Sequence, residues 1–237
     1  MSNKLLNLND IVFMGDEFPT NQYYKQPTKK TQIVLHHTVS GGSALGDINW
    51  WKMTAGRIAT HFIVDRSGVI YQLYSSKYWA HHIGVTNKVF GEYNIKGNNL
   101  KLNQNSIGIE IDSWGPLMED INTNKWYPVM LDENTNIYKP NIRSKHIDVK
   151  NIEFYPNGYR GFFAYEKYTQ AQLESVSQLL VYLTKKHNIP KTYNSDMWYM
   201  STDALNGFPG IWSHVSYRPD KTDCHPQTSL KIMLSEL

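Results

Sequence analysis

The chain has 237 residues, which is enough for one large domain or two small ones with a substantial buried core. Hydrophobic residues make up 41% and charged residues 19%, which excludes a disordered chain, and no apolar run reaches the length of a membrane span. The net charge of +3 is too small to favour nucleic acid as a partner, and the single cysteine excludes an intramolecular disulfide.

Residues 1–30 are expected to form a polar, proline-containing lead-in segment before a main domain at 31–237. Asn7, Asn9 and Asp10 interrupt the apolar residues near the start, so the segment lacks the continuous hydrophobic stretch of a signal peptide. We therefore expect a protein that is made in the cytoplasm and does not insert into a membrane.

Residues 31–37 have the length and β-branched content of a strand. Because side chains alternate between the two faces of a strand, His36 and His37 are expected to point in opposite directions. Only one of these two histidines can therefore reach a given site.

Three more segments carry clear patterns. Apolar residues recur at helical spacing over 43–55, and Gly56 suits the end of that helix. Residues 61–73 consist of two short β-rich runs around a glycine-containing turn, which predicts a hairpin. Residues 106–112 alternate, with isoleucines on one face and Glu110 on the other, where a carboxylate faces either solvent or a cleft.

Residues 113–168 are rich in turns and aromatic residues and have no sustained period, so we expect an insertion of loops and short hairpins that elaborates the main sheet. Thr169 and Gln172 then form a capping box, which predicts a helix that runs up to about residue 188. A strand end is expected to deliver His214. The alternation of strands and helices indicates a single α/β domain.

Ligand-type side chains are concentrated in residues 213–226, which hold two histidines, two aspartates, a lysine and the only cysteine. A catalytic zinc ion typically takes three protein ligands and keeps an open position. His214 and Asp223 are candidates from this stretch, and His36 is the upstream candidate. A hydrogen-bonded core position is commoner for any one histidine, but the set together favours a metal site.

Other kinds of site have less support. The chain has no Gly-x-Ser-x-Gly motif for a serine hydrolase, and no Cys-x-x-Cys or His-x-x-x-His repeat for a structural zinc site. Cys224 remains a possible nucleophile with His214 or His225, although the neighbouring Asp223 would raise the pKa of its thiol.

A series of short segments resembles the zinc-dependent N-acetylmuramoyl-L-alanine amidases of the type 2 family, which includes phage lysozyme-type amidases and peptidoglycan recognition proteins. Each motif alone is weak, but together they follow the family's order from about residue 31 to the end of the chain. The matching segments are 33–38, 60–68, 80–84, 105–111, 168–172 and 214–226.

The resemblance implies a central mixed β-sheet flanked by helices, with one Zn²⁺ per chain. Its first two ligands would be His36 and His214. In this family the third ligand is an Asp or Cys two residues after a lysine, which gives Lys221 followed by Asp223. Cys224 stands one position too late and is the alternative third ligand.

The resemblance also implies catalytic and binding roles. Glu110 occupies the place of the general base in one branch of the family, and this chain has Thr60 where many members have a catalytic tyrosine. Lys221 would stabilise an oxyanion, while His82, Thr60 and Trp79 would line the substrate groove.

The implied reaction is hydrolysis of the amide bond between N-acetylmuramic acid and L-alanine of the stem peptide in peptidoglycan. Such an enzyme would act in cell-wall lysis, as a phage endolysin does, or in cell-wall turnover, and a monomer is favoured. The alternative is a peptidoglycan-binding module without activity, because one fold can host both functions. A complete ligand set together with a base and a lysine favours the enzyme.

Overall fold

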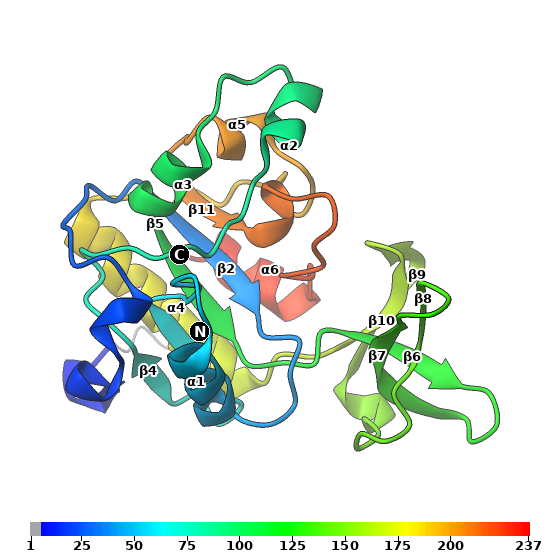
Figure 1. Cartoon of the computed structure of the whole chain (residues 1–237). Coiled ribbons are helices and arrows are strands. Elements are labelled where there is room, and N and C mark those ends of the chain that lie inside the picture. Colours follow the sequence, from blue (N-terminus) through cyan, green and yellow to red (C-terminus); the bar gives the residue numbers. More distant parts are fainter. Residues whose placement is uncertain (1–5) are drawn as a thin grey trace.

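A six-stranded mixed β-sheet lies at the centre of the protein, with the strand order β1-β4-β3-β5-β2-β11 (Figure 1). The computed structural model describes residues 6–237. Strands β2, β5 and β11 are parallel, whereas β3 and β4 form the predicted antiparallel hairpin. The strands of this sheet are β1 (Ile11–Phe13), β2 (Gln32–His37), β3 (Phe62–Val64), β4 (Ile70–Gln72), β5 (Ser106–Ile111) and β11 (Gly210–Ser213).

Helices cover both faces of this sheet. Phe62 and Val64 of β3 pack in the same core cluster as α4, whereas Ile63 between them packs in the cluster of α1. The two helices therefore lie on opposite faces, which confirms the predicted α/β fold with a central mixed sheet. The α-helices are α1 (Ala44–Met53), α2 (Asn87–Glu92), α3 (Asn99–Asn105), α4 (Gln170–His187), α5 (Thr202–Leu205) and α6 (Thr228–Ser235).

The helix boundaries follow local capping chemistry. In α1 the Ser43 hydroxyl accepts a hydrogen bond from the Gly46 amide, and the helix ends at Met53, a little before the expected stop. In α4 the predicted capping box is present, and Asn188 ends the helix with a left-handed backbone (φ 54°). Single 3₁₀ turns occur at η1 (Leu8–Asp10), η2 (Gly15–Glu17), η3 (Thr20–Gln22), η4 (Val149–Asn151) and η5 (His214–Ser216).

The parallel strands at the centre of the sheet bring three segments of the sequence together at their carboxyl-terminal ends. All six residues of β2 are buried, as expected for a parallel strand covered on both faces. Since β5 and β11 run parallel to β2, their carboxyl ends meet at the same edge. His36 is in register with Glu110, and His214 directly follows β11.

Residues 113–168 contain short hairpins, as expected, but the expectation that they elaborate the main sheet was wrong. These residues do not elaborate the main sheet but form a separate five-stranded antiparallel sheet, ordered β8-β7-β6-β10-β9, which stands beside the main sheet (Figure 1). The strand pattern of alternating apolar and polar residues is not visible in β9, because Pro156 and Gly158 interrupt it. Both residues are tolerated there because β9 is an edge strand. The strands are β6 (Pro116–Asp120), β7 (Lys125–Asp132), β8 (Ile137–Pro140), β9 (Ile152–Tyr159) and β10 (Phe162–Glu166). We call β6 to β10 the second sheet.

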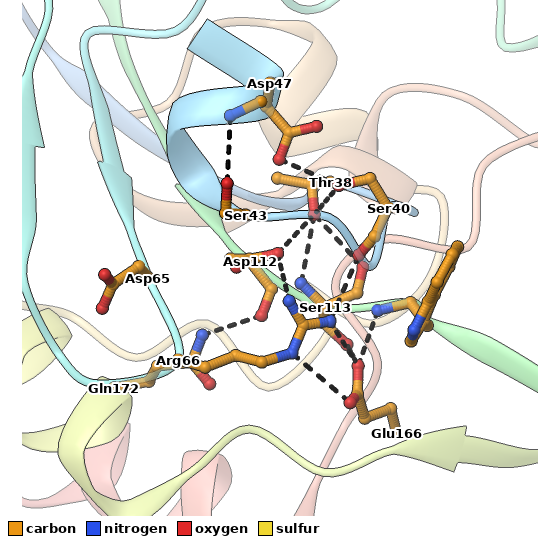
Figure 2. A network of polar contacts seen from close by, with 12 residues as sticks. Thr38, Ser40, Ser43, Asp47, Asp65, Arg66, Asp112, Ser113, Glu166 and Gln172 are labelled. Carbon is orange, nitrogen blue, oxygen red and sulfur yellow. Dashed lines mark hydrogen bonds and ion pairs between the residues drawn. The ribbon is translucent and has the colours of Figure 1, made fainter. Parts of the chain in front are cut away.

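A polar network joins the second sheet to the main sheet (Figure 2). Arg66, in the β3–β4 turn, donates to Asp112 Oδ1 at 2.6 Å and to Glu166 Oε2 at 2.9 Å. Glu166 also accepts hydrogen bonds from the Trp114 amide at 2.7 Å and the Ser113 hydroxyl at 3.3 Å. Because residues 112–114 lead into the second sheet and Glu166 ends it, Arg66 fixes both connections.

The expected lead-in segment contributes to the fold. Its strand β1 pairs in parallel with β4 at the edge of the main sheet, and Tyr24 stacks on Trp79 with ring centroids 3.8 Å apart. Residues 1–5 of the lead-in lie outside the described part of the chain. Among residues 6–237, no helix is both long enough and apolar enough to cross a bilayer.

Candidate metal centre

Three buried side chains converge at the edge of the sheet where β2 and β11 end. His36 Nδ1 lies 3.0 Å from His214 Nδ1, and Asp223 Oδ2 lies 3.2 Å from the first and 2.9 Å from the second. The Asp223 carbonyl accepts the Val215 amide at 2.9 Å, which ties the loop carrying this aspartate to the residues after β11. These three groups, far apart in sequence, are able to hold a metal ion.

The hydrogen-bond partner of His214 fixes the tautomer of its ring. His214 Nε2 lies 2.8 Å from the carbonyl oxygen of Ile83, which can only accept a hydrogen bond. The ring hydrogen is therefore on Nε2. His214 Nδ1 carries a lone pair that points at His36 and Asp223.

A chain of hydrogen bonds fixes His36 in the same way. The Ser106 hydroxyl donates to the Leu102 carbonyl at 2.6 Å and so accepts from His82 Nε2 at 2.9 Å. His82 Nδ1 is then left to accept from His36 Nε2 at 3.0 Å. His36 Nδ1 therefore also carries a lone pair, directed at Asp223.

Three lone pairs thus point at one another, which is repulsive unless a cation lies among them. Two imidazole nitrogens and a carboxylate oxygen are donors that zinc accepts, and tetrahedral ligation at about 2.0–2.1 Å places such donors about 3.3 Å apart. The observed separations of 2.9 to 3.2 Å are close to this spacing. The residues therefore fit a metal ion of this kind.

The protonation states suit the same purpose, because metal ligands must be deprotonated. Burial, together with His214, lowers the pKa of His36 to about 4, so its ring is neutral at neutral pH. Burial opposes ionisation of Asp223. When a proton, instead of a metal ion, lies among the three groups, the charge on His214 and the hydrogen bonds from the two imidazoles outweigh this effect and hold the pKa of the carboxyl well below its usual range. Asp223 is therefore ionised.

The structure places Asp223, and not Cys224, beside the two histidines. Cys224 is buried in the main core cluster and is not one of the converging groups. Burial and the neighbouring Asp223 raise the pKa of its thiol well above the usual value, which keeps it protonated.

A cavity of about 490 Å³ opens next to the three converging side chains. Its walls include Glu110, Lys221, Thr60 and His82. Glu110 Oε2 is buried and has no hydrogen-bond partner within residues 6–237. Burial, and then Asp223 and Asp47, raise the pKa of Glu110 well above its usual value, so this carboxyl holds a proton more tightly than an exposed glutamate does.

The sequence profile of the N-acetylmuramoyl-L-alanine amidase family matches residues 26–227. The chain belongs to this family. The predicted family is thereby confirmed, and membership supports a peptidoglycan amidase activity for this protein.

Several solved structures also align with this one over most of their length. PlyL is 13% identical, with 98% of this chain and 93% of that chain covered and a TM-score of 0.48. The endolysin N-acetylmuramoyl-L-alanine amidase LysCS from Clostridium intestinale is 14% identical, with 99% of each chain covered and a TM-score of 0.45. The catalytic domain of XlyA is 16% identical, with 97% and 98% covered and a TM-score of 0.49. No curated protein sequence matches the chain.

The expected substrate-binding residues of the amidase lie in different surroundings. Thr60 lines the cavity, although its hydroxyl donates to the Phe62 carbonyl at 3.0 Å. His82 also lines the cavity, but both of its ring nitrogens are engaged by His36 and Ser106. Trp79 is buried against Tyr24 and is not part of the cavity wall, so the structure does not bring it to the site.

Two residues that support the site were missed in the sequence. Ser106 was considered only as the start of a strand, and Asn103 was not considered. The Asn103 side-chain oxygen accepts the amides of His82 at 2.7 Å and Ile83 at 3.0 Å, which holds the segment facing both histidine ligands. No periodic pattern indicates these roles, because each residue supports the site through hydrogen bonds to residues 82 and 83, which are distant in sequence.

Replacing His82 with alanine is expected to weaken metal binding about 10- to 100-fold, because His36 loses the acceptor that fixes its tautomer. Competition with a chromogenic chelator measures this affinity directly. His81→Ala is the matched control, since His81 lines the same cavity but bonds to Tyr24. Equal metal affinities for the two variants would show that the hydrogen-bond chain does not support the ligand.

Proposed function

We propose that this amidase cleaves the amide bond between N-acetylmuramic acid and L-alanine of the stem peptide, with one Zn²⁺ per chain held by His36, His214 and Asp223. The observation that carries the proposal is the convergence of two imidazole nitrogens and a carboxylate oxygen beside a cavity lined by Glu110, whose Oε2 has no hydrogen-bond partner among residues 6–237. A binding module has no chemical need for this combination.

A zinc ion in this position supplies Lewis acidity, which polarises an amide carbonyl and makes water a better nucleophile at neutral pH. The remaining work falls to side chains of the protein. Glu110 takes the proton of the attacking water and passes it to the departing amine. Its raised pKa suits both transfers, since a carboxylate with a raised pKa is a stronger base towards water and, once protonated, can donate that proton to the amine.

Lys221 is proposed to donate a hydrogen bond to the carbonyl oxygen of the amide as it becomes an oxyanion. It lines the cavity two residues before Asp223, so the same loop supplies a metal ligand and a positive charge. A fixed donor aimed at developing charge in a partly buried site contributes strongly to rate. We assign Glu110 as the base because the position of the alternative tyrosine is occupied by Thr60, which has no titratable group.

The composition of the cavity wall suits a sugar linked to an acidic peptide. Apolar side chains of Val39, Trp51 and Ile58 can contact sugar and alanine carbons, while Arg218 and Lys221 can pair with carboxylates of the stem peptide. We propose peptidoglycan or its soluble muropeptides as the substrate, with a monomer acting in cell-wall lysis, as endolysins do, or in turnover.

The test is to incubate the purified protein with intact sacculi and, separately, with soluble muropeptides, and to identify the products by mass spectrometry. The expected products are stem peptides with a free L-alanine amine and glycans with a free lactyl carboxylate. A chelator should abolish these products, and added Zn²⁺ should restore them. Binding to sacculi without any product would instead identify a non-catalytic binding module.

A further inference from the structure

The turn between β9 and β10 of the second sheet reaches the loop that carries the proposed catalytic lysine and third ligand. We call residues 218–224 the active-site loop. The turn consists of Arg160 and Gly161, both with positive φ angles, 48° and 87°. Two-residue hairpin turns with this backbone favour Asn-Gly, because side chains other than Asn and Asp are strained there. An arginine in the first position is therefore unexpected from backbone preference alone.

The Arg160 side chain bonds to the main chain of the active-site loop. Its Nε donates to the Lys221 carbonyl at 2.8 Å, and its Nη2 donates to the carbonyls of Arg218, at 3.3 Å, and Pro219. A guanidinium presents several donors in a fixed plane, so it can hold several carbonyls of one turn together. No shorter or uncharged side chain could make these contacts from the same position.

A second contact holds the far end of the active-site loop. Tyr159, the residue before Arg160, is buried and places its hydroxyl 3.1 Å from the carbonyl of Cys224. Directly after the loop, the Tyr155 hydroxyl lies 2.8 Å from His225 Nδ1. The β9–β10 hairpin therefore contacts the active-site loop near its beginning and at its end, on either side of Asp223.

The hairpin itself is fixed on the main sheet. Glu166 ends β10 and is bonded to Arg66, which also bonds Asp112 at the carboxyl end of β5 (Figure 2). Strand β5 carries Glu110. Glu110 and the active-site loop are therefore connected by contacts through the second sheet, in addition to the contacts through the main sheet.

We propose that the second sheet positions the active-site loop, with Arg160 as the positioning residue for Lys221 and Asp223. Arg160 is not part of the cavity wall, so it acts through the loop and not on the substrate. The roles of Lys221 and Asp223 rest on the proposed function, but the contacts made by Arg160 do not.

The decisive variant is Arg160→Asn. Asparagine is preferred in this turn, so the hairpin should be as stable as before or more stable, while the side chain is too short to reach the loop. We expect amide hydrogen exchange in the active-site loop to become about tenfold faster, with exchange across the second sheet unchanged. The Lys221 amide, bonded to the Arg218 carbonyl, and the Val215 amide, bonded to the Asp223 carbonyl, are the reporters.

The zinc affinity of Arg160→Asn should fall about tenfold, because the loop supplies the proposed third ligand. The kcat should fall with KM nearly unchanged, because the loop contributes more to stabilising charge in the transition state than to binding the substrate in the ground state. Arg160→Lys keeps the charge and one donor group, so its zinc affinity and kcat should lie between those of the unchanged protein and those of Arg160→Asn. Arg143→Asn is the matched control, since it makes the same charge change in an exposed turn of the same segment.

Loop exchange in Arg160→Asn equal to that in Arg143→Asn would overturn the proposal. Faster exchange throughout the second sheet would also overturn it, because it would mean that Arg160 only stabilises the hairpin. Exchange is measured on the metal-free protein, so the result does not depend on activity. A loosened loop in a protein that releases no peptide from sacculi would contradict the proposed function and leave the positioning role in place.

Discussion

The Asp223→Ala variant is expected to lose stoichiometric zinc and to lose at least about a thousandfold in amidase turnover. Two imidazoles would remain, without the only carboxylate among the three converging groups. Metal content by atomic emission after gel filtration, together with release of L-alanine amines from sacculi, measures both effects. Thermal unfolding of the metal-free proteins shows whether the fold survives the change.

Cys224→Ala separates this role from the general importance of the loop. It truncates the neighbouring buried side chain, so it should cost some stability, about 1–2 kcal/mol, while zinc content and turnover remain close to those of the unchanged protein. The opposite pattern, with zinc lost in Cys224→Ala and retained in Asp223→Ala, would show that the cysteine is the third ligand.

The Glu110→Gln variant should retain zinc but lose about 10²- to 10⁴-fold in turnover, which is the range for removal of a general acid–base group. The amide has the same shape as the carboxyl but cannot accept the proton of water. Zinc retention is expected because Glu110 is not one of the three converging groups. Single-turnover measurements on soluble muropeptides would place the loss in the chemical step.

Asp47→Asn provides the matched control for Glu110→Gln. Asp47 lies on α1, bonds to the Ser40 hydroxyl at 2.9 Å, and loses the same charge on substitution. Its turnover should fall far less than that of Glu110→Gln, because Asp47 is not part of the cavity wall and influences Glu110 only through its charge. Near-normal turnover in fully zinc-loaded Glu110→Gln would place the base elsewhere.

The main sheet and the positions of the candidate ligands could be predicted because local patterns carry that information. The β-branched run before His36, the alternation around Glu110 and the capping box at Thr169 each describe a short stretch of chain. Parallel pairing of β2 with β5 and β11 then brings the ends of those stretches together. Family motifs supplied the choice of which polar side chains matter.

The second sheet and the supporting contacts could not be predicted, because they depend on pairings that leave no period in the sequence. Pro156 and Gly158 lie within β9 itself, although such residues normally mark the end of a strand. His82 was expected to face the substrate, and the bonds to His36 and Ser106 that occupy its ring appear only in three dimensions. Arg160 was indistinguishable from any charged turn residue.

The hydrogen bonds of residues 82 and 83 connect the two histidines of the candidate metal centre. The ring of His82 orients His36, the carbonyl of Ile83 orients His214, and both amides are bound by Asn103. The two ligands are thus coupled through one short segment and one side-chain oxygen. Substitutions there should combine non-additively, so the centre evolves as a single unit instead of ligand by ligand.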